Sequence, residues 1–185
     1  DNVWIIVDCS GSMAGTPIKT ATLFAAALSK ANSSATNVTI TMFSDRATHV
    51  AVNINDSVTT IAKYLTSKVY GGGTNLEAAL QLKSTLGFEP DVVVVLSDMQ
   101  VNQLSTGRTS ISKQFTKDAI LVALNLAGNN TTPLSEIDGF YQLAGWSDKI
   151  FDFIPAMKNK NSVVETLDMT YVGIGKINTV IVEEI

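Results

Sequence analysis

The chain has 185 residues, of which 45% are hydrophobic and 16% are charged, and its formal net charge is −4. This composition suits one globular domain, and we expect residues 1–185 to be a single domain excised from a larger protein. No Lys/Arg cluster is present, which disfavours nucleic-acid binding by this chain, and no apolar run is long enough to cross a bilayer. The single cysteine, Cys9, excludes an internal disulfide and favours a cytoplasmic location, with an extracellular location as the alternative.

The first predicted element is a buried strand. "VWIIV" (3–7) is a continuous apolar run, typical of a strand buried on both faces. Thr16 followed by Pro17 predicts the cap and first position of a helix. "NVTITMF" (37–43) and "THVAVNI" (48–54) predict two strands joined by a link too short for a crossover helix. We therefore expect this pair to be an antiparallel hairpin.

The second half of the chain continues the alternation of helices and strands. Asp56 is predicted to cap a helix, and in "YGGGTNLEAALQLKSTL" (70–86) Thr74 opens a capping box and a further helix. "PDVVVVLSD" (90–98) and "AILVALNL" (119–126) are typical of buried parallel strands. The remaining predictions are a short strand at 139–145, helices beginning at Ser147 and Ser162, and an edge strand or linker at 177–185.

This order of elements predicts an α/β fold. We expect a doubly wound, mostly parallel central sheet of Rossmann-like type, with helices on both faces and one antiparallel edge strand. In such sheets, ligands bind at the carboxyl ends of the strands, near the point where the strand order switches. Functional side chains are therefore expected at that edge of the sheet.

Five side chains that carry oxygen are predicted to meet at this edge: Asp8, Ser10, Ser12, Thr74 and Asp98. Residues two apart in an extended loop point the same way, so the first three can share one face while Cys9 points into the core. Two neighbouring carboxylates repel each other, and a divalent cation between them would relieve that repulsion. Carboxylates and hydroxyls suit Mg²⁺, with Mn²⁺ or Ca²⁺ as alternatives.

This pattern resembles the metal-ion-dependent adhesion site (MIDAS) of von Willebrand factor A domains. In that family Asp-x-Ser-x-Ser is followed by a distant Thr and a distant Asp, as in "DCSGSM", "GGGTNL" and "VVVVLSDM" here. The resemblance implies that Ser10, Ser12 and often Thr74 touch the metal. It implies that Asp8 and Asp98 act directly or through water, and that an Asp or Glu of a partner protein completes the coordination.

A narrower resemblance concerns "VVVVLSDMQ" and the later "LAGWSDKIFDFIP". Together they resemble the carboxyl-terminal A domain of Ro-type (TROVE) RNA-binding proteins and their bacterial relatives. In those proteins a separate helical-repeat ring binds the RNA. The resemblance therefore implies a ribonucleoprotein role for the parent protein, without direct nucleic-acid contact by this domain.

Each candidate residue also has a structural interpretation. Thr74 is a good helix cap, Ser-Gly-Ser is common in turns, and Asp98 could cap a turn. Their joint occurrence at one edge favours a metal site over three separate roles. His49 lies in the middle of a predicted strand, where a surface or half-buried structural role is favoured over a Ser/His/Asp triad.

The sequence therefore favours a non-enzymatic, metal-dependent protein-binding module. One alternative is a metal-dependent hydrolase in which the same ion activates water. Two others are an extracellular adhesion domain and a domain whose ion is purely structural. Residues flanking the site would set its specificity: Met13, Ala14, Gly72, Gly73, Asn75, Met99 and Gln100.

Overall fold

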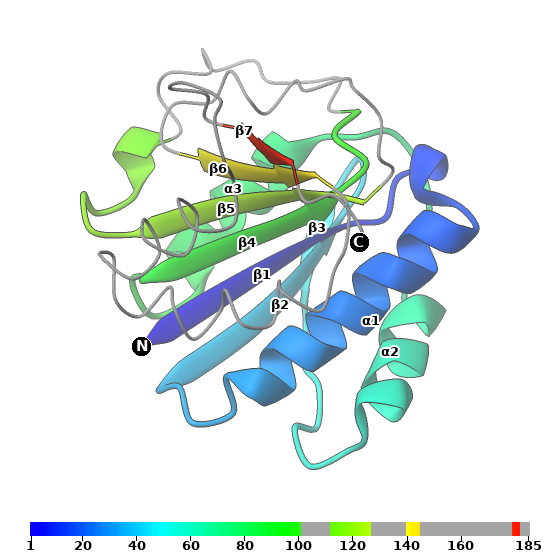
Figure 1. Cartoon of the computed structure of the whole chain (residues 1–185), viewed down its shortest axis with the longest axis horizontal. Coiled ribbons are helices and arrows are strands. Elements are labelled where there is room, and N and C mark those ends of the chain that lie inside the picture. Colours follow the sequence, from blue (N-terminus) through cyan, green and yellow to red (C-terminus); the bar gives the residue numbers. More distant parts are fainter. Residues whose placement is uncertain (101–111, 127–139, 145–178, 182–185) are drawn as a thin grey trace.

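A computed structural model describes residues 1–100, 112–126, 140–144 and 179–181 (Figure 1). They contain one sheet with the strand order β3-β2-β1-β4-β5-β6-β7. All neighbouring strands are parallel except β2 and β3, which form the predicted antiparallel hairpin at one edge. The strands are β1 (Asn2–Asp8), β2 (Asn37–Phe43), β3 (Ala47–Val50), β4 (Val92–Ser97), β5 (Ile120–Asn125), β6 (Phe140–Ala144) and β7 (Thr179–Ile181).

Helices cover both faces of the sheet, with α1 and α2 on one face and α3 on the other (Figure 1). The sequence prediction of a doubly wound, mostly parallel α/β fold is therefore confirmed. No helix in the described ranges is long and apolar enough to span a membrane. The helices are α1 (Thr16–Ala31), α2 (Val58–Ser67) and α3 (Leu76–Gln81), with 3₁₀ turns η1 (Gly11–Met13), η2 (Leu82–Thr85) and η4 (Ser112–Gln114).

Alternate side chains along β1 belong to two hydrophobic layers, one on each face of the sheet. Ile5 and Val7 belong to the cluster on the α1 face, whereas Trp4 and Ile6 belong to the cluster on the α3 face. All four are fully buried, which explains why the strand is a continuous apolar run. The Trp4 ring packs at 6.3 Å from that of Phe115, near the end of η4. β1 is thus an interior strand of the sheet, between β2 and β4, with side chains buried on both faces.

The strand order switches between β1 and β4. The chain passes from β1 through α1 to β2 on one side, whereas β4 and β5 extend the sheet on the other side. Val7 pairs with Leu96, so Asp8 and Ser97 end neighbouring strands at the same edge. A crevice for ligands is expected at such a switch point.

Two helix starts differ from the sequence prediction. α1 already includes Thr16, and Gly15 occupies the cap position with a φ of 89°. α2 is capped by Ser57, whose hydroxyl accepts the backbone N–H of Thr60 at 3.1 Å, and not by Asp56. In both places two adjacent residues, Gly15 and Thr16 or Asp56 and Ser57, are suitable helix caps, and the sequence alone does not decide which one is used.

Other predicted elements have mixed outcomes. β6 confirms the short strand at 139–145, and β7 confirms the edge strand at 177–185 as the last strand of the sheet. β3 is shorter than predicted, since it ends at Val50. The helices predicted from Ser147 and Ser162 lie outside the described residues.

Candidate metal centre

Asp8 sits at the end of β1 with its carboxylate held from two sides. Its side chain is fully buried. Oδ1 accepts the backbone N–H of Ser10 at 2.9 Å, and Oδ2 accepts the hydroxyl of Ser97 at 2.6 Å. The carboxylate therefore has one fixed orientation.

The electrostatic environment of Asp8 disfavours its charged form. Burial is the main cause that raises the pKa of this carboxyl above its usual range, and the negative charge of Asp98 adds to it. The hydrogen bonds from Ser97 and Ser10 act in the opposite direction. A cation beside Asp8 and Asp98 would relieve both the desolvation and the repulsion.

The hydroxyls of Ser10 and Ser12 lie close together, but the loop that carries them is not extended throughout. Ser10 is extended, with a φ of −62° and a ψ of 168°, and the chain then turns into η1. This turn leaves the Oγ atoms of Ser10 and Ser12 3.1 Å apart. The prediction that alternation continues to Ser12 is therefore wrong, although the two hydroxyls do lie together. Cys9 points into the core as predicted, and its Sγ donates to the backbone oxygen of Phe43 at 3.0 Å.

Thr74 is not the cap of α3. The side chain of Asn75 accepts the backbone N–H of Ala78 at 3.2 Å, so Asn75 is the cap and the predicted capping box is wrong. α3 also ends at Gln81 and passes into η2, so no single helix continues to residue 86. Thr74 itself is buried, with 5% of its surface exposed. Its hydroxyl is therefore not needed for capping.

The Thr74 loop is joined to the serine loop by a backbone hydrogen bond. The N–H of Gly11 donates to the carbonyl oxygen of Gly72 at 2.8 Å. A methyl group on Gly11 would lie 3.5 Å from that same oxygen, so the two loops are in close contact. The structure thus places Gly11, which follows Ser10, in contact with Gly72, two residues before Thr74.

Asp98 follows β4 in a strained backbone segment. Its side chain is 1% exposed, and Oδ1 accepts the N–H of Gln100 at 3.1 Å. Met99 has a φ of 64°, in the left-handed region that costs a residue with a side chain about 1 kcal/mol. Met99 is nevertheless buried, and its N–H donates to Ser97 Oγ at 3.0 Å. Such strain is concentrated at functional sites.

The donors available here are hydroxyls and carboxylates. Nowhere in the described ranges do three or more His, Cys, Asp or Glu side chains gather as a metal cluster. The candidate donors at this edge are the carboxylates of Asp8 and Asp98 and the hydroxyls of Ser10, Ser12 and Thr74, and hard oxygen donors of this kind would suit Mg²⁺. The residues present fit the group that the sequence pattern implied.

Ser97 and Asp45 were missed by the sequence reasoning. Ser97 could have been found from the register, because it ends the strand beside Asp8 and its side chain is fully buried. Asp45 lies in the turn between β2 and β3, and its Oδ1 accepts the N–H of Gly73 at 2.9 Å. Nothing in the local sequence indicates this contact, which joins residues 28 positions apart.

His49 has a structural role in the described part of the chain. Its Nδ1 lies 2.8 Å from Thr41 Oγ1 and its Nε2 lies 2.8 Å from Thr85 Oγ1. Thr41 Oγ1 also accepts the indole N–H of Trp4 at 2.7 Å. Both ring nitrogens are thus engaged in a chain of bonds from β1 to η2, which supports the interpretation as a half-buried structural histidine.

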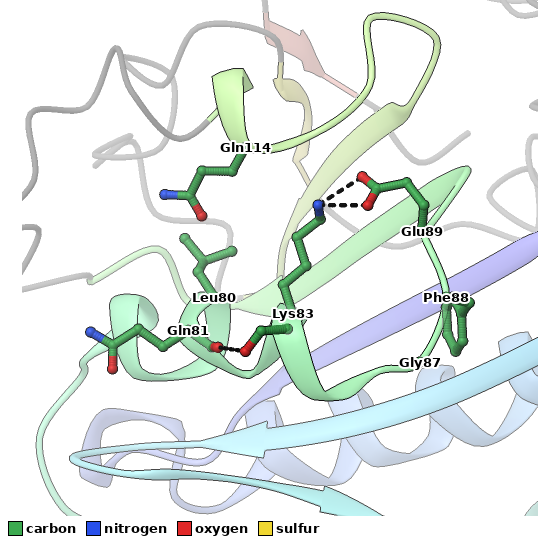
Figure 2. A pocket seen from close by; sticks show the side chains of 8 residues that line it. Leu80, Gln81, Lys83, Gly87, Phe88, Glu89 and Gln114 are labelled. Atoms are coloured by element: carbon green, nitrogen blue, oxygen red, sulfur yellow. Dashed lines mark hydrogen bonds and ion pairs between the residues drawn. The ribbon is translucent and has the colours of Figure 1, made fainter.

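A separate pocket of about 610 Å³ lies between η2 and the segment that leads into β4 (Figure 2). Lys83 spans it and pairs with both carboxylate oxygens of Glu89, at 2.7 and 2.8 Å. The Lys83 ammonium also lies 5.3 Å from the centre of the Phe115 ring. Lys83 and Glu89 precede β4, and Gln114 and Phe115 precede β5, so the pocket lies at the amino ends of these strands, away from the candidate metal centre. Lys83, the cation among its described lining residues, is already paired.

Fold and site together define a doubly wound α/β domain with a candidate cation centre at its switch point. Residues 3–100, more than half of the chain, match the von Willebrand factor type A domain, and the chain belongs to this family. No curated protein sequence matches it.

Proteins whose solved structures share this fold include the following three. The chain is 15% identical to the Ro (RSR) protein of Deinococcus radiodurans, with a TM-score of 0.65 over 89% of this chain and 34% of that one. An aerotolerance-related membrane protein from Bacteroides fragilis, with multiple mutations to serines, is 16% identical, with a TM-score of 0.56 over 89% and 98% of the two chains. Proximal thread matrix protein 1 from the mussel byssus is 15% identical, with a TM-score of 0.55 over 87% and 45%.

Proposed function

We propose that this domain is a divalent-metal-dependent protein-binding module. Mg²⁺ would be held by the hydroxyls of Ser10, Ser12 and Thr74, with Asp8 and Asp98 acting directly or through water. The observation that carries the proposal is the pair of serine hydroxyls 3.1 Å apart in the loop after a buried carboxylate whose pKa is raised by burial and by a second carboxylate. Such a carboxylate pair favours a cation.

The charge balance of the site supports a protein ligand. Two carboxylates only neutralise a dication, so the ion stays able to attract one further carboxylate. An Asp or Glu side chain of a partner protein would supply it. Specificity would then come from the residues that flank the ion, among them Met13, Asn75 and Gln100.

The hydrolase alternative finds less support. A hydrolase needs a general base beside the ion that is not itself taken up by the ion. The carboxylates named at this centre are Asp8 and Asp98, and both of them are assigned to the metal in the proposed function. We therefore favour a binding role over a catalytic one.

Titration calorimetry with Mg²⁺ tests the proposal directly. Asp8→Ala is expected to weaken Mg²⁺ binding by at least about tenfold, because it removes a carboxylate beside the ion. Asp91→Ala is the matched control, since Asp91 also accepts a backbone N–H, that of Asn2 at 2.8 Å, but at the amino end of β4. Equal affinities of wild type and Asp8→Ala would reject the metal site.

A narrower proposal concerns the parent protein. Of the three structures compared, the Deinococcus Ro protein gives the highest TM-score, and the chain spans about a third of its length. We propose that this is the A domain of a Ro-type protein, in which RNA binding belongs to other parts. A full-length sequence with a helical-repeat region would support this, and a parent without one would reject it.

A further inference from the structure

The turn between β2 and β3 forms hydrogen bonds with the Thr74 loop on both sides of Thr74. The carboxylate Oδ1 of Asp45 accepts the N–H of Gly73 at 2.9 Å. The carbonyl oxygen of Ser44 accepts the N–H of Asn75 at 2.8 Å. The residues before and after Thr74 are therefore both bonded to the same turn.

The glycines before Thr74 make room for this carboxylate. A methyl group on Gly72 would lie 2.3 Å from Asp45 Oδ2, and one on Gly73 would lie 2.5 Å from Oδ1, so neither would fit without displacing Asp45. Gly72 also has a φ of 113°, which residues with side chains rarely adopt. The glycine run and Asp45 are complementary in shape.

Further contacts join the Thr74 loop to the serine loop and stabilise the turn between β2 and β3. Gly72, one residue from the Asp45 contact, accepts the N–H of Gly11 at 2.8 Å. Within the turn, the N–H of Ser44 donates to the carbonyl oxygen of Arg46 at 2.8 Å. The hydroxyl of Tyr70 donates to that same oxygen at 2.8 Å, and the Arg46 guanidinium lies 5.0 Å from the centre of the Tyr70 ring.

We propose that Asp45 is a positioning residue of the metal centre, a role that rests on the proposed function. By holding the glycine run, it sets where Thr74 lies relative to Ser10 and Ser12. It does not contact the ion. Side chains that orient metal ligands commonly contribute about 10- to 100-fold to metal affinity.

Three variants separate positioning from charge. Asp45→Ala removes the acceptor and should weaken Mg²⁺ binding about tenfold in calorimetry. Asp45→Asn removes the charge but keeps an oxygen that can accept the Gly73 N–H, so its affinity should stay within about threefold of wild type. Asp91→Ala, the matched loss of an exposed carboxylate that accepts a backbone N–H, should leave the affinity unchanged. An Asp45→Asn variant as weak as Asp45→Ala would show that only charge matters and would overturn the proposal.

A second readout does not depend on metal. In the metal-free protein with chelator, Asp45→Ala should speed hydrogen exchange of the Gly11 amide about tenfold or more, because the loop that accepts its bond is released. Asp91→Ala should not, and equal exchange in the two variants would overturn the positioning role. If the wild type fails to bind Mg²⁺, the proposed function is rejected, and the exchange result still decides whether Asp45 positions the loop.

Discussion

Ser97 holds Asp8 more tightly than any other side chain in the described site. Its hydroxyl donates to Asp8 Oδ2 at 2.6 Å and accepts the N–H of Met99 at 3.0 Å. In Ser97→Ala, the Asp8 carboxylate loses a bond in a buried place, which should lower the free energy of unfolding by about 1–3 kcal/mol. Mg²⁺ affinity should fall about tenfold or more, because Asp8 is no longer oriented. Urea denaturation and calorimetry measure the two effects.

Ser29 provides the matched control for this prediction. It is also a fully buried serine, and its hydroxyl donates to the backbone oxygen of Ala26 at 2.8 Å within α1. Ser29→Ala should alter stability but leave Mg²⁺ affinity at the wild-type value. If Ser97→Ala binds Mg²⁺ as tightly as Ser29→Ala does, Ser97 has no role in the metal centre.

Cys9 should make stability depend on pH in the alkaline range. Burial, helped by the negative charge of Asp8, raises the pKa of the thiol from 9.0 to about 11. Between these values the folded protein keeps a proton that the unfolded chain has lost, so the free energy of unfolding falls as pH rises, by about 2–3 kcal/mol over the window. Below pH 9 this group contributes no pH dependence.

Urea denaturation from pH 8 to 10, with reductant and chelator, measures this slope. Cys9→Ala should flatten it, since the titrating thiol is gone. The range stops at pH 10 because burial also raises the pKa of Tyr70 to about 12, and its titration would add a slope of the same sign. A slope that survives in Cys9→Ala would assign the effect to another group.

The start of α3 divides two roles between adjacent residues. Asn75 caps the helix, whereas Thr74 is buried and does not cap it. Asn75→Ala should lower the free energy of unfolding by about 1 kcal/mol and leave Mg²⁺ affinity nearly unchanged. Thr74→Val, which removes only the hydroxyl, should weaken Mg²⁺ binding about tenfold with little change in stability.

Thermal melts in chelator and Mg²⁺ calorimetry on both variants test this division. The crossed pattern is the informative result, because a general loosening of the loop would weaken both properties in both variants. The reverse pattern, with Thr74→Val destabilised and its metal affinity intact, would restore Thr74 to the capping role that the sequence predicted.

The capping error shows where local sequence reasoning stops. Thr74 and Asn75 are both good caps, so the pattern alone cannot choose between them. A tertiary hydrogen bond accompanies the use of Asn75 as the cap: its backbone N–H donates to the carbonyl oxygen of Ser44, in the turn after β2. The same limit hid Asp45, whose partner Gly73 lies 28 positions away.

Strands and their order were more accessible to sequence reasoning than the site loops. The apolar runs in β1 and β4 reflect burial on both faces of the sheet, which the helices that cover the two faces impose. The short link between β2 and β3 excludes a crossover, so their antiparallel pairing follows from chain length. The η1 turn at Ser12, in contrast, is accompanied by a hydrogen bond between Gly11 and Gly72. Such a contact leaves no periodic pattern of apolar residues from which the turn could be predicted.

At the scale of the whole molecule, the sheet brings together residues of the candidate metal centre from distant parts of the chain. Asp8 and Ser97 are 89 positions apart in sequence, yet they bond because β1 and β4 are neighbours at the switch point. The Thr74 loop reaches the same edge from between α2 and α3. A cation at this point would add a further link between segments that hydrogen bonds such as Gly11–Gly72 and Ser97–Asp8 already join. Metal binding should therefore stabilise the whole fold.

Thermal unfolding with and without Mg²⁺ tests this global effect. Binding to the folded state alone adds about 2.7 kcal/mol when the free Mg²⁺ concentration is a hundred times the Kd. For a domain of 185 residues this corresponds to a rise in Tm of roughly 5–10 °C, reversed by chelator. Asp8→Ala should lose the rise, whereas Asp91→Ala should keep it. NaCl at matched ionic strength controls for screening of the net charge of −4, and a rise that persists in Asp8→Ala would assign Mg²⁺ stabilisation to the surface and not to this centre.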